Sequence, residues 1–303
     1  MKKLEIIFDG LFHFRYTSKM ARPHEVPLVV LGLIITIVGI TLNLLIFILY
    51  IAKKSIPRNF SNRLLLHHAF VDLVNLVILV LPFTCRSLYL FSIEDRLKHS
   101  GEFDDKWNAI FLYFYEMLPL STNSTVFTFT LEAIDRLIAN HCKKMHEKFQ
   151  RKRIMIPIIT LIWLLSIIPT VIMFFEFWMA SWVFKYAIDC MTIINTILIV
   201  LAFYKSRKKL IQHRLIINDH PENQNVIEMV KRDFRLTLIF FLMFIIFLLP
   251  AIGLSVGAKR MQQRGDKYFI LMIYSIGVAS TLNPVLTLTL KGHFKGTQVR
   301  SMH

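Results

Sequence analysis

The fold is decided by a long apolar stretch near the N-terminus. Residues 26–51 read VPLVVLGLIITIVGITLNLLIFILYI and carry no charged side chain. About 20 apolar residues in a helix, each rising ~1.5 Å, cross the hydrocarbon core of a bilayer. We therefore predict a transmembrane helix here. Six further apolar stretches follow along the chain, near 62–90, 108–141, 153–178, 182–204, 232–256 and 267–290.

The composition agrees with a membrane protein. Of the 303 residues, 55% are hydrophobic and only 18% are charged, and the mean hydropathy is +0.53. Soluble domains are roughly 45–50% apolar and about a quarter charged, so a single soluble core is excluded, as is intrinsic disorder. The three cysteines are too few for a disulfide scaffold or a cysteine-rich metal site.

We predict an all-α membrane protein, a seven-transmembrane helix bundle, although six or eight spans remain open. Residues 1–25 carry charges throughout and lack the apolar core of a signal peptide, so we expect an extracellular N-terminus there. Residues 26–290 would form the transmembrane domain, and residues 291–303 a short cytoplasmic amphipathic helix and tail. The sequence has no internal repeat and no Gly/Ser linker, which favours one bundle.

The basic residues are distributed unevenly between the two sides that seven spans define. One side, with the C-terminus, holds 21 Lys and Arg against five acids, whereas the other holds 14 against 12. Loops rich in Lys and Arg stay in the cytoplasm, so the N-terminus is expected outside in a multi-pass plasma-membrane protein. Anionic lipid would attract the basic loops. Nucleic-acid binding is disfavoured because membrane helices separate these charges.

A few polar groups fall inside the predicted spans. A charge at the bilayer centre costs roughly 2.5–3.5 kcal/mol on insertion scales and commonly marks a functional site. Asp72 and Asn75 share a face of the second span, Asn43 lies in the first, and Asn283 precedes Pro284 in the seventh. Such groups must face the bundle interior. They could instead only hold helices together, and the Asp135-Arg136 pair could be a snorkelling pair at a helix end.

Here the chain resembles the rhodopsin-like (class A) G-protein-coupled receptors, over about residues 28–296. The resembling motifs stand in the family's order, each in the matching span. They are Gly39–Asn43 in the first, Ala69–Leu73 in the second, Asp135-Arg136-Leu137 in the third, Trp163 in the fourth, Phe244 and Pro250 in the sixth, Asn283-Pro284 with Thr287 in the seventh, and Phe294-Lys295 beyond it.

The resemblance implies a role for each matched residue. Asp135 would hold Arg136 at rest, and Arg136 would contact a heterotrimeric G protein when active, supported by Tyr204. Phe244 would act as a packing switch, and Pro250 and Pro284 would shape the sixth and seventh helices. An inner polar cluster would hold sodium or a proton and would otherwise need no cofactor; its members would be Asn43, Asp72, Thr125, Ser280 and Asn283.

The chain also departs from the family pattern. Leu248 stands where the sixth helix usually carries Trp, with Phe247 as a neighbour able to substitute in part. Leu137 and Thr287 each replace a Tyr. The disulfide from the third helix to the second outer loop is absent, since Phe111 stands there. Cys85 and Cys190 do not form an obvious pair, and we expect buried thiols.

An outer pocket is predicted from the same alignment of spans. Leu118 lies five helical turns before Arg136, where receptors for amines carry Asp, so a biogenic amine is disfavoured. The other candidate pocket residues are Thr122, Leu248, Ser255 and Tyr274. This apolar pocket with hydroxyl groups suits a peptide or a small apolar chemical.

Two rival functions remain. A transporter or channel would explain Asp72 and Asn283, but no inverted repeat or matching broken helices are present. A receptor-like protein that does not signal would be consistent with Leu137, Thr287 and Leu248. We expect no enzymatic activity, because His67-His68 and the other histidines lack metal-ligand or catalytic spacing, and no metal beyond sodium at Asp72.

Overall fold

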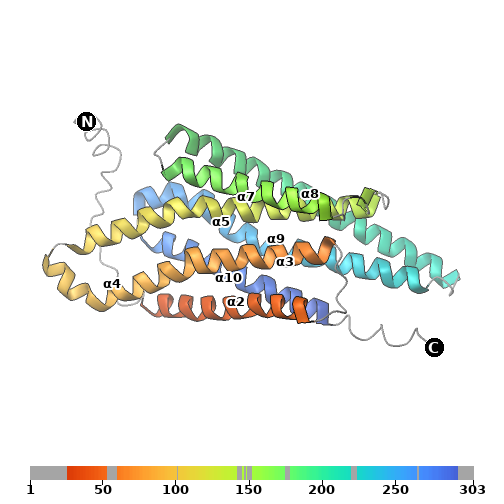
Figure 1. Cartoon of the computed structure of the whole chain (residues 1–303), viewed down its shortest axis with the longest axis horizontal. Coiled ribbons are helices and arrows are strands. Elements are labelled where there is room, and N and C mark those ends of the chain that lie inside the picture. Colours follow the sequence, from red (N-terminus) through yellow and green to blue (C-terminus); the bar gives the residue numbers. More distant parts are fainter. Residues whose placement is uncertain are drawn as a thin grey trace.

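The protein folds as a bundle of long helices that run along one common axis (Figure 1). The computed structural model describes residues 26–52, 60–100, 102–141, 145–146, 148, 152–174, 178–219, 224–264 and 266–292, in places as backbone only. The helices are α2 (Val26–Ala52), α3 (Phe60–Val74), the π-helix η2 (Asn75–Val80), α4 (Leu81–Ser100), α5 (Glu102–His141), α7 (Lys152–Phe174), α8 (Trp178–Asp219), α9 (Gln224–Arg264) and α10 (Asp266–Gly292).

The described helices form seven rods, because α3, η2 and α4 follow one another without a break and form a single rod. Each rod holds all or most of one predicted span; the fourth, predicted over 153–178, is described as α7 only to Phe174. All described elements are helical, which confirms the all-α prediction for these residues. The predicted N-terminal region 1–25 and nearly all of the predicted amphipathic helix and tail, 293–303, lie outside the described residues.

Several helices extend well beyond the apolar stretches. Between the fifth and sixth stretches, α8 continues to Asp219 and α9 begins at Gln224. Between the second and third, α4 continues to Ser100 and α5 begins at Glu102. Polar residues such as Lys, Arg and Glu are good helix formers, so a helix can continue after its apolar stretch ends.

The surface of the bundle is apolar where a membrane would contact it. Among the described residues, three helical segments are long and apolar enough to cross a bilayer: Val26–Ala52, Arg63–Leu90 and Asp189–His213. Large hydrophobic side chains point outward from α2, α7 and α8, including Ile34, Ile48, Ile156, Ile193 and Ile197. An exposed apolar surface of this extent marks a membrane protein with several candidate spans.

Helix α5 is central to the bundle. It packs against α3, η2, α4, α7, α8 and α9. One buried apolar cluster joins α5 to α8 and α9 around Phe129, Phe240 and Phe244, and another joins α2, η2, α4 and α10 around Leu76, Phe83 and Ile273. Polar side chains of α3, α5 and α10, among them Asp72, Thr125 and Asn283, are also buried in the bundle.

A glycine allows α2 to approach α10 closely. A Cβ at Gly39 would overlap the hydroxyl of Thr281 and lie 2.9 Å from a methyl carbon of Leu76. The Thr281 hydroxyl also donates to the carbonyl of Ile35 across the same interface, at 3.1 Å. The short separation of these helices places Asn43, one turn further along α2, within reach of α10.

Candidate functional site

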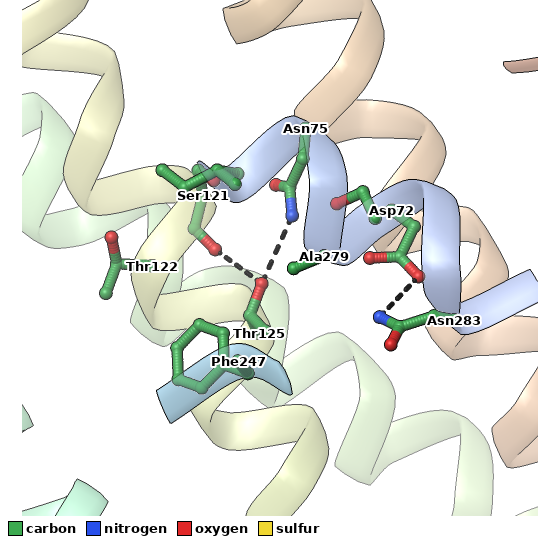
Figure 2. Close-up of a pocket in the computed structure, with 10 residues that line it drawn as sticks. Asp72, Asn75, Ser121, Thr122, Thr125, Phe247, Ala279 and Asn283 are labelled. Atoms are coloured by element: carbon green, nitrogen blue, oxygen red, sulfur yellow. Dashed lines mark hydrogen bonds between the residues drawn. The ribbon is translucent and has the colours of Figure 1, made fainter. Parts of the chain in front are cut away.

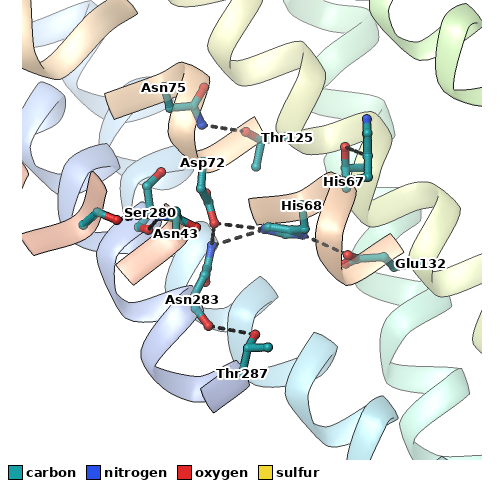
Figure 3. Close-up of polar contacts among 12 residues, drawn as sticks. Asn43, His67, His68, Asp72, Asn75, Thr125, Glu132, Ser280, Asn283 and Thr287 are labelled. Carbon is teal, nitrogen blue, oxygen red and sulfur yellow. Dashed lines mark hydrogen bonds and ion pairs between the residues drawn. The ribbon is translucent and has the colours of Figure 1, made fainter. Parts of the chain in front are cut away.

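The inner polar cluster predicted from the sequence comes together in the structure (Figure 3). Asn43 of α2 donates to the backbone carbonyl of Ser280 in α10 at 3.0 Å. Asn283, one turn along α10, donates through Nδ2 to Asp72 Oδ2 of α3, also at 3.0 Å. All four side chains are buried. The last rod is thus connected to the first two through polar groups in the bundle interior.

The other predicted member, Thr125 of α5, lies on the outer side of this cluster. Asn75 Nδ2 donates to Thr125 Oγ1 at 3.2 Å, and that hydroxyl donates to the carbonyl of Ser121. Figure 2 shows these groups around a small cavity between η2, α5 and α10, with Asp72 on its wall. The cavity has room for little more than a water molecule. The five predicted residues therefore line one continuous polar region.

Two further residues, which sequence reasoning missed, extend the cluster toward the inner end. His68 Nδ1 lies 2.9 Å from Glu132 Oε1 of α5, and His68 Nε2 lies 3.8 Å from Asp72 Oδ2. The same Nε2 is 3.2 Å from Asn283 Nδ2. Neither residue was predicted to belong to a site, yet both are fully buried.

Helical spacing could have identified this pair. His68 precedes Asp72 by four residues, and Glu132 precedes Arg136 by four, so each shares a helix face with a residue already predicted to face inward. A glutamate within an apolar span is itself a signal, because it requires a partner there.

The donor set around Asp72 does not fit a sodium ion. Hard cations favour oxygen ligands, but a basic imidazole bonded to a second carboxylate lies beside Asp72. Asn283 presents its amide nitrogen, not its oxygen, to the carboxylate. The buried amide oxygens of Asn75 and Asn283 have no protein partner, and a water molecule can supply the donor they need. Among the described residues no group of three or more His, Cys, Asp or Glu could hold a metal ion.

The C-terminal end of α5 carries the predicted Asp135-Arg136 pair, and both residues are buried. The Arg136 guanidinium donates to Asp135 Oδ2 through Nε at 3.0 Å and again through a terminal nitrogen. Asp135 Oδ1 lies 3.0 Å from His146 Nε2, which belongs to the segment after α5. Arg136 also lies over the ring of Phe240 in α9, 5.9 Å from its centroid. Arg136 is thus held inside the bundle and is not a snorkelling side chain.

Three aromatic rings pack together beside the cavity. Phe129 packs edge-to-face against Phe244, with centroids 5.3 Å apart, and lies tilted by 44° against Phe247 at the same distance. Phe247 lines the cavity, as expected of the neighbour of Leu248. Leu248 packs against the apolar cluster of α5, α8 and α9 and is not a lining residue of this cavity. Pro250 lies within α9, but its side chain is outside the described ones.

The residues predicted for a ligand pocket do not converge. Thr122 lines the small cavity, whereas Leu118 packs against the cluster of α2, η2, α4 and α10. Tyr274 packs against Gly32 and edge-to-face on Phe83, centroids 6.0 Å apart, so its ring faces α2 and α4. Ser255 lies in α9 with its side chain outside the described ones. Thr122 is thus the only one of these described side chains on the wall of the cavity.

Tyr204, Cys85 and Cys190 lie apart from the cluster. Tyr204 of α8 is 63% exposed, so it takes no part in the buried surroundings of Arg136 in this conformation. The expectation of buried thiols is wrong, because Cys85 and Cys190 are both exposed and both free. They face outward from α4 and α8, where a thiol can face lipid as a small hydrophobic group. The Thr287 hydroxyl, where the family has Tyr, bonds its own helix at the carbonyl of Asn283.

No protein-family model matches this chain, and no curated protein is significantly similar to it. A functional assignment must therefore come from the residues themselves and from their arrangement.

Proposed function

We propose that this chain is a receptor of the rhodopsin-like class that transmits the binding of an extracellular ligand to a heterotrimeric G protein. The ligand would be a peptide or a small apolar chemical, and the seven rods would all span the plasma membrane with the N-terminus outside. The proposal agrees with the apolar surface and with the excess of basic residues on one side of the predicted spans.

One observation carries the proposal: motif residues from four separate spans lie in one buried polar column. Asn43, Asp72 and Asn283 are joined across α2, α3 and α10, and Asp135-Arg136 lies below them on α5. Burying five polar or charged groups costs free energy unless each has a hydrogen-bond or ion-pair partner. Because some of these partners stand on other helices, the free energy of the buried groups depends on how the helices are arranged. A bundle of this kind can have two packings whose balance a ligand shifts.

The segment expected to move is the cytoplasmic end of α9, beside Arg136. In the conformation described, Arg136 is bonded to Asp135 and covered by Phe240 of α9. Displacing the inner end of α9 would remove the ring from Arg136 and expose the guanidinium to the cytoplasm. Arg136 could then donate to backbone carbonyls of a G protein, while His146 still contacts Asp135. A partner that binds only the displaced state would stabilise it.

The test is nucleotide exchange in cells that express the chain with a panel of G proteins, at rest and with peptide and odorant libraries. Arg136→Ala should abolish exchange. Because the change removes the guanidinium from a buried carboxylate, surface expression is measured in parallel and exchange is compared at equal expression. Arg207→Ala is the matched control, because it removes an exposed arginine from α8, on the same side of the predicted membrane, and should leave exchange nearly unchanged. Exchange that persists in Arg136→Ala would contradict the mechanism.

A transporter is the second candidate, favoured by the buried ionisable chain of Glu132, His68 and Asp72. Ionisable residues in series within a bundle can relay protons. Proton or ion flux in the same cells without any nucleotide exchange would favour the transporter over the receptor.

A further inference from the structure

The buried triad of His68, Asp72 and Glu132 is a group of charges that the receptor proposal does not use. The imidazole lies between the two carboxylates, 2.9 Å from Glu132 and 3.8 Å from Asp72. None of the three side chains is more than 2% exposed. The ring of Phe129 packs edge-to-face on the imidazole, with centroids 4.9 Å apart, and shields it on one side.

Two carboxylates at this depth need a positive charge. An isolated buried carboxylate is unfavourable by several kcal/mol, and two within reach of one ring also repel each other. On α5 the next charges are Asp135 and Arg136, which neutralise each other. The polar neighbours on α2 and α10, Asn43 and Asn283, are neutral amides.

The remaining neighbours supply no positive charge either. His67, on α3, faces away: its Nδ1 lies 3.5 Å from the Thr128 hydroxyl and its ring packs on Trp163. On the other side of Phe129, α9 contributes the uncharged rings of Phe244 and Phe247. Among the described residues, His68 is therefore the one basic group placed between Asp72 and Glu132.

We propose that His68 is the resident cation of the bundle: its imidazolium ring bridges Glu132 and Asp72 and takes the place of a bound sodium ion. Nδ1–H donates to Glu132 Oε1, and Nε2–H points toward Asp72 Oδ2, beside the amide of Asn283. The amide nitrogen of Asn283, which donates to Asp72 Oδ2 at 3.0 Å, lies 3.2 Å from His68 Nε2, so both nitrogens lie beside the same carboxylate.

The bridge also connects two levels of the bundle. Asp72 and Asn283 belong to the polar cluster beside the cavity. Glu132 lies on α5, one helical turn before Arg136 and on the same face of that helix. His68 thus joins α3 and α10 to α5 through charge. The inference is independent of the receptor proposal, because it concerns the occupant of the polar centre and not the partner at the inner end.

The first test measures whether sodium stabilises the purified full-length chain. Unfolding midpoints are compared in sodium chloride and in choline chloride at equal ionic strength, because a ligand that binds only the folded state raises the midpoint. We expect coincident midpoints for the wild type. A sodium-specific rise that Asp72→Asn removes would overturn the proposal.

A double variant should gain the response to sodium that the wild type is expected to lack. His68→Leu with Glu132→Leu removes the bridge and leaves Asp72 without a counter-charge, and sodium should now raise the midpoint. His67→Leu is the matched control, since it removes the neighbouring buried histidine that contacts neither carboxylate, and it should give no sodium response. A folded double variant without any sodium response would overturn the proposal.

The second test reads the ring directly and does not depend on whether the double variant folds. Histidine labelled with ¹⁵N in the ring gives different nitrogen signals for imidazolium and neutral imidazole. The signal lost in His68→Gln should be that of an imidazolium at neutral pH, while His141→Gln removes an exposed histidine and serves as the control. A neutral His68 ring would overturn the proposal. Neither test uses a G protein, so failure of the receptor proposal would not affect either result.

Discussion

At the scale of single residues, the polar centre is a set of matched charges and amides. Asp72, Asn43 and Asn283 could be predicted to face inward, because a polar group in an apolar stretch has no other favourable environment. Their contacts could not be predicted, since which amide meets which carboxylate depends on how α2, α3 and α10 are rotated. His68 and Glu132 were missed because each was considered alone, and only their pairing explains both.

The pairing leads to a stability prediction. Replacing one member of a buried ion pair leaves the other charge uncompensated, which typically costs about 3–5 kcal/mol, whereas replacing both with apolar residues is often nearly neutral. We therefore expect His68→Leu, which leaves Glu132 and Asp72 without a counter-charge, to lower the unfolding midpoint strongly, and Glu132→Leu, which leaves His68 beside Asp72, to lower it less. The double variant should recover only part of the loss caused by His68→Leu, because Asp72 remains without a counter-charge. Thermal unfolding of the four proteins in detergent measures this, and additive effects of the two single changes would show that the side chains are not coupled.

At the scale of elements, the apolar stretches located all seven rods but not their ends. Burial and hydropathy determine where a helix meets lipid, whereas the ends of α4, α5, α8 and α9 are set by helix propensity in polar sequence. The π-helix η2 was not expected. Pro82 follows it and has no backbone N–H to give to the residue four positions earlier, and Leu81 N–H bonds the carbonyl of Leu76 five positions back.

The contact of α2 with α10 gives a prediction for one element. Gly39→Leu would push a side chain into Thr281 and Leu76, and overpacking of this kind typically costs about 1–3 kcal/mol. It should also displace Asn43 from Ser280. The adjacent change Val38→Leu is the control, because Val38 is exposed. A drop in unfolding midpoint is expected for Gly39→Leu only, and equal midpoints would mean that the two helices are not closely packed.

At the scale of the whole molecule, the net charge and the apolar surface are both explained by a membrane protein whose basic loops lie on one side. The formal net charge is +16, and sorting Lys and Arg by predicted side assigns the excess to the side of the C-terminus. That side would face anionic lipid and a signalling partner. The number of rods, and the fact that the chain is a membrane protein, could be predicted from the sequence, because both follow from the number and length of the apolar stretches. The outer pocket could not, because Leu118 and Tyr274 pack into the apolar cluster of α2, η2, α4 and α10 and do not line the small cavity.

Orientation can be tested on intact cells. A tag on the N-terminus should be stained without permeabilisation, and a tag on the C-terminus only after it, because the basic loops hold the inner side in the cytoplasm. Staining of both tags on intact cells would require an even number of spans, and staining of the C-terminal tag alone would reverse the orientation.

The most direct test of the receptor claim is whether a G protein opens the inner end of the bundle. Spin labels at His141 of α5 and Met229 of α9, both exposed, report the distance between these helices once the native cysteines are replaced. Adding a nucleotide-free G protein to the reconstituted chain should lengthen that distance, and Arg136→Ala should prevent the change. If no member of the panel binds or alters the distance in the wild type, the chain does not act as a G-protein-coupled receptor.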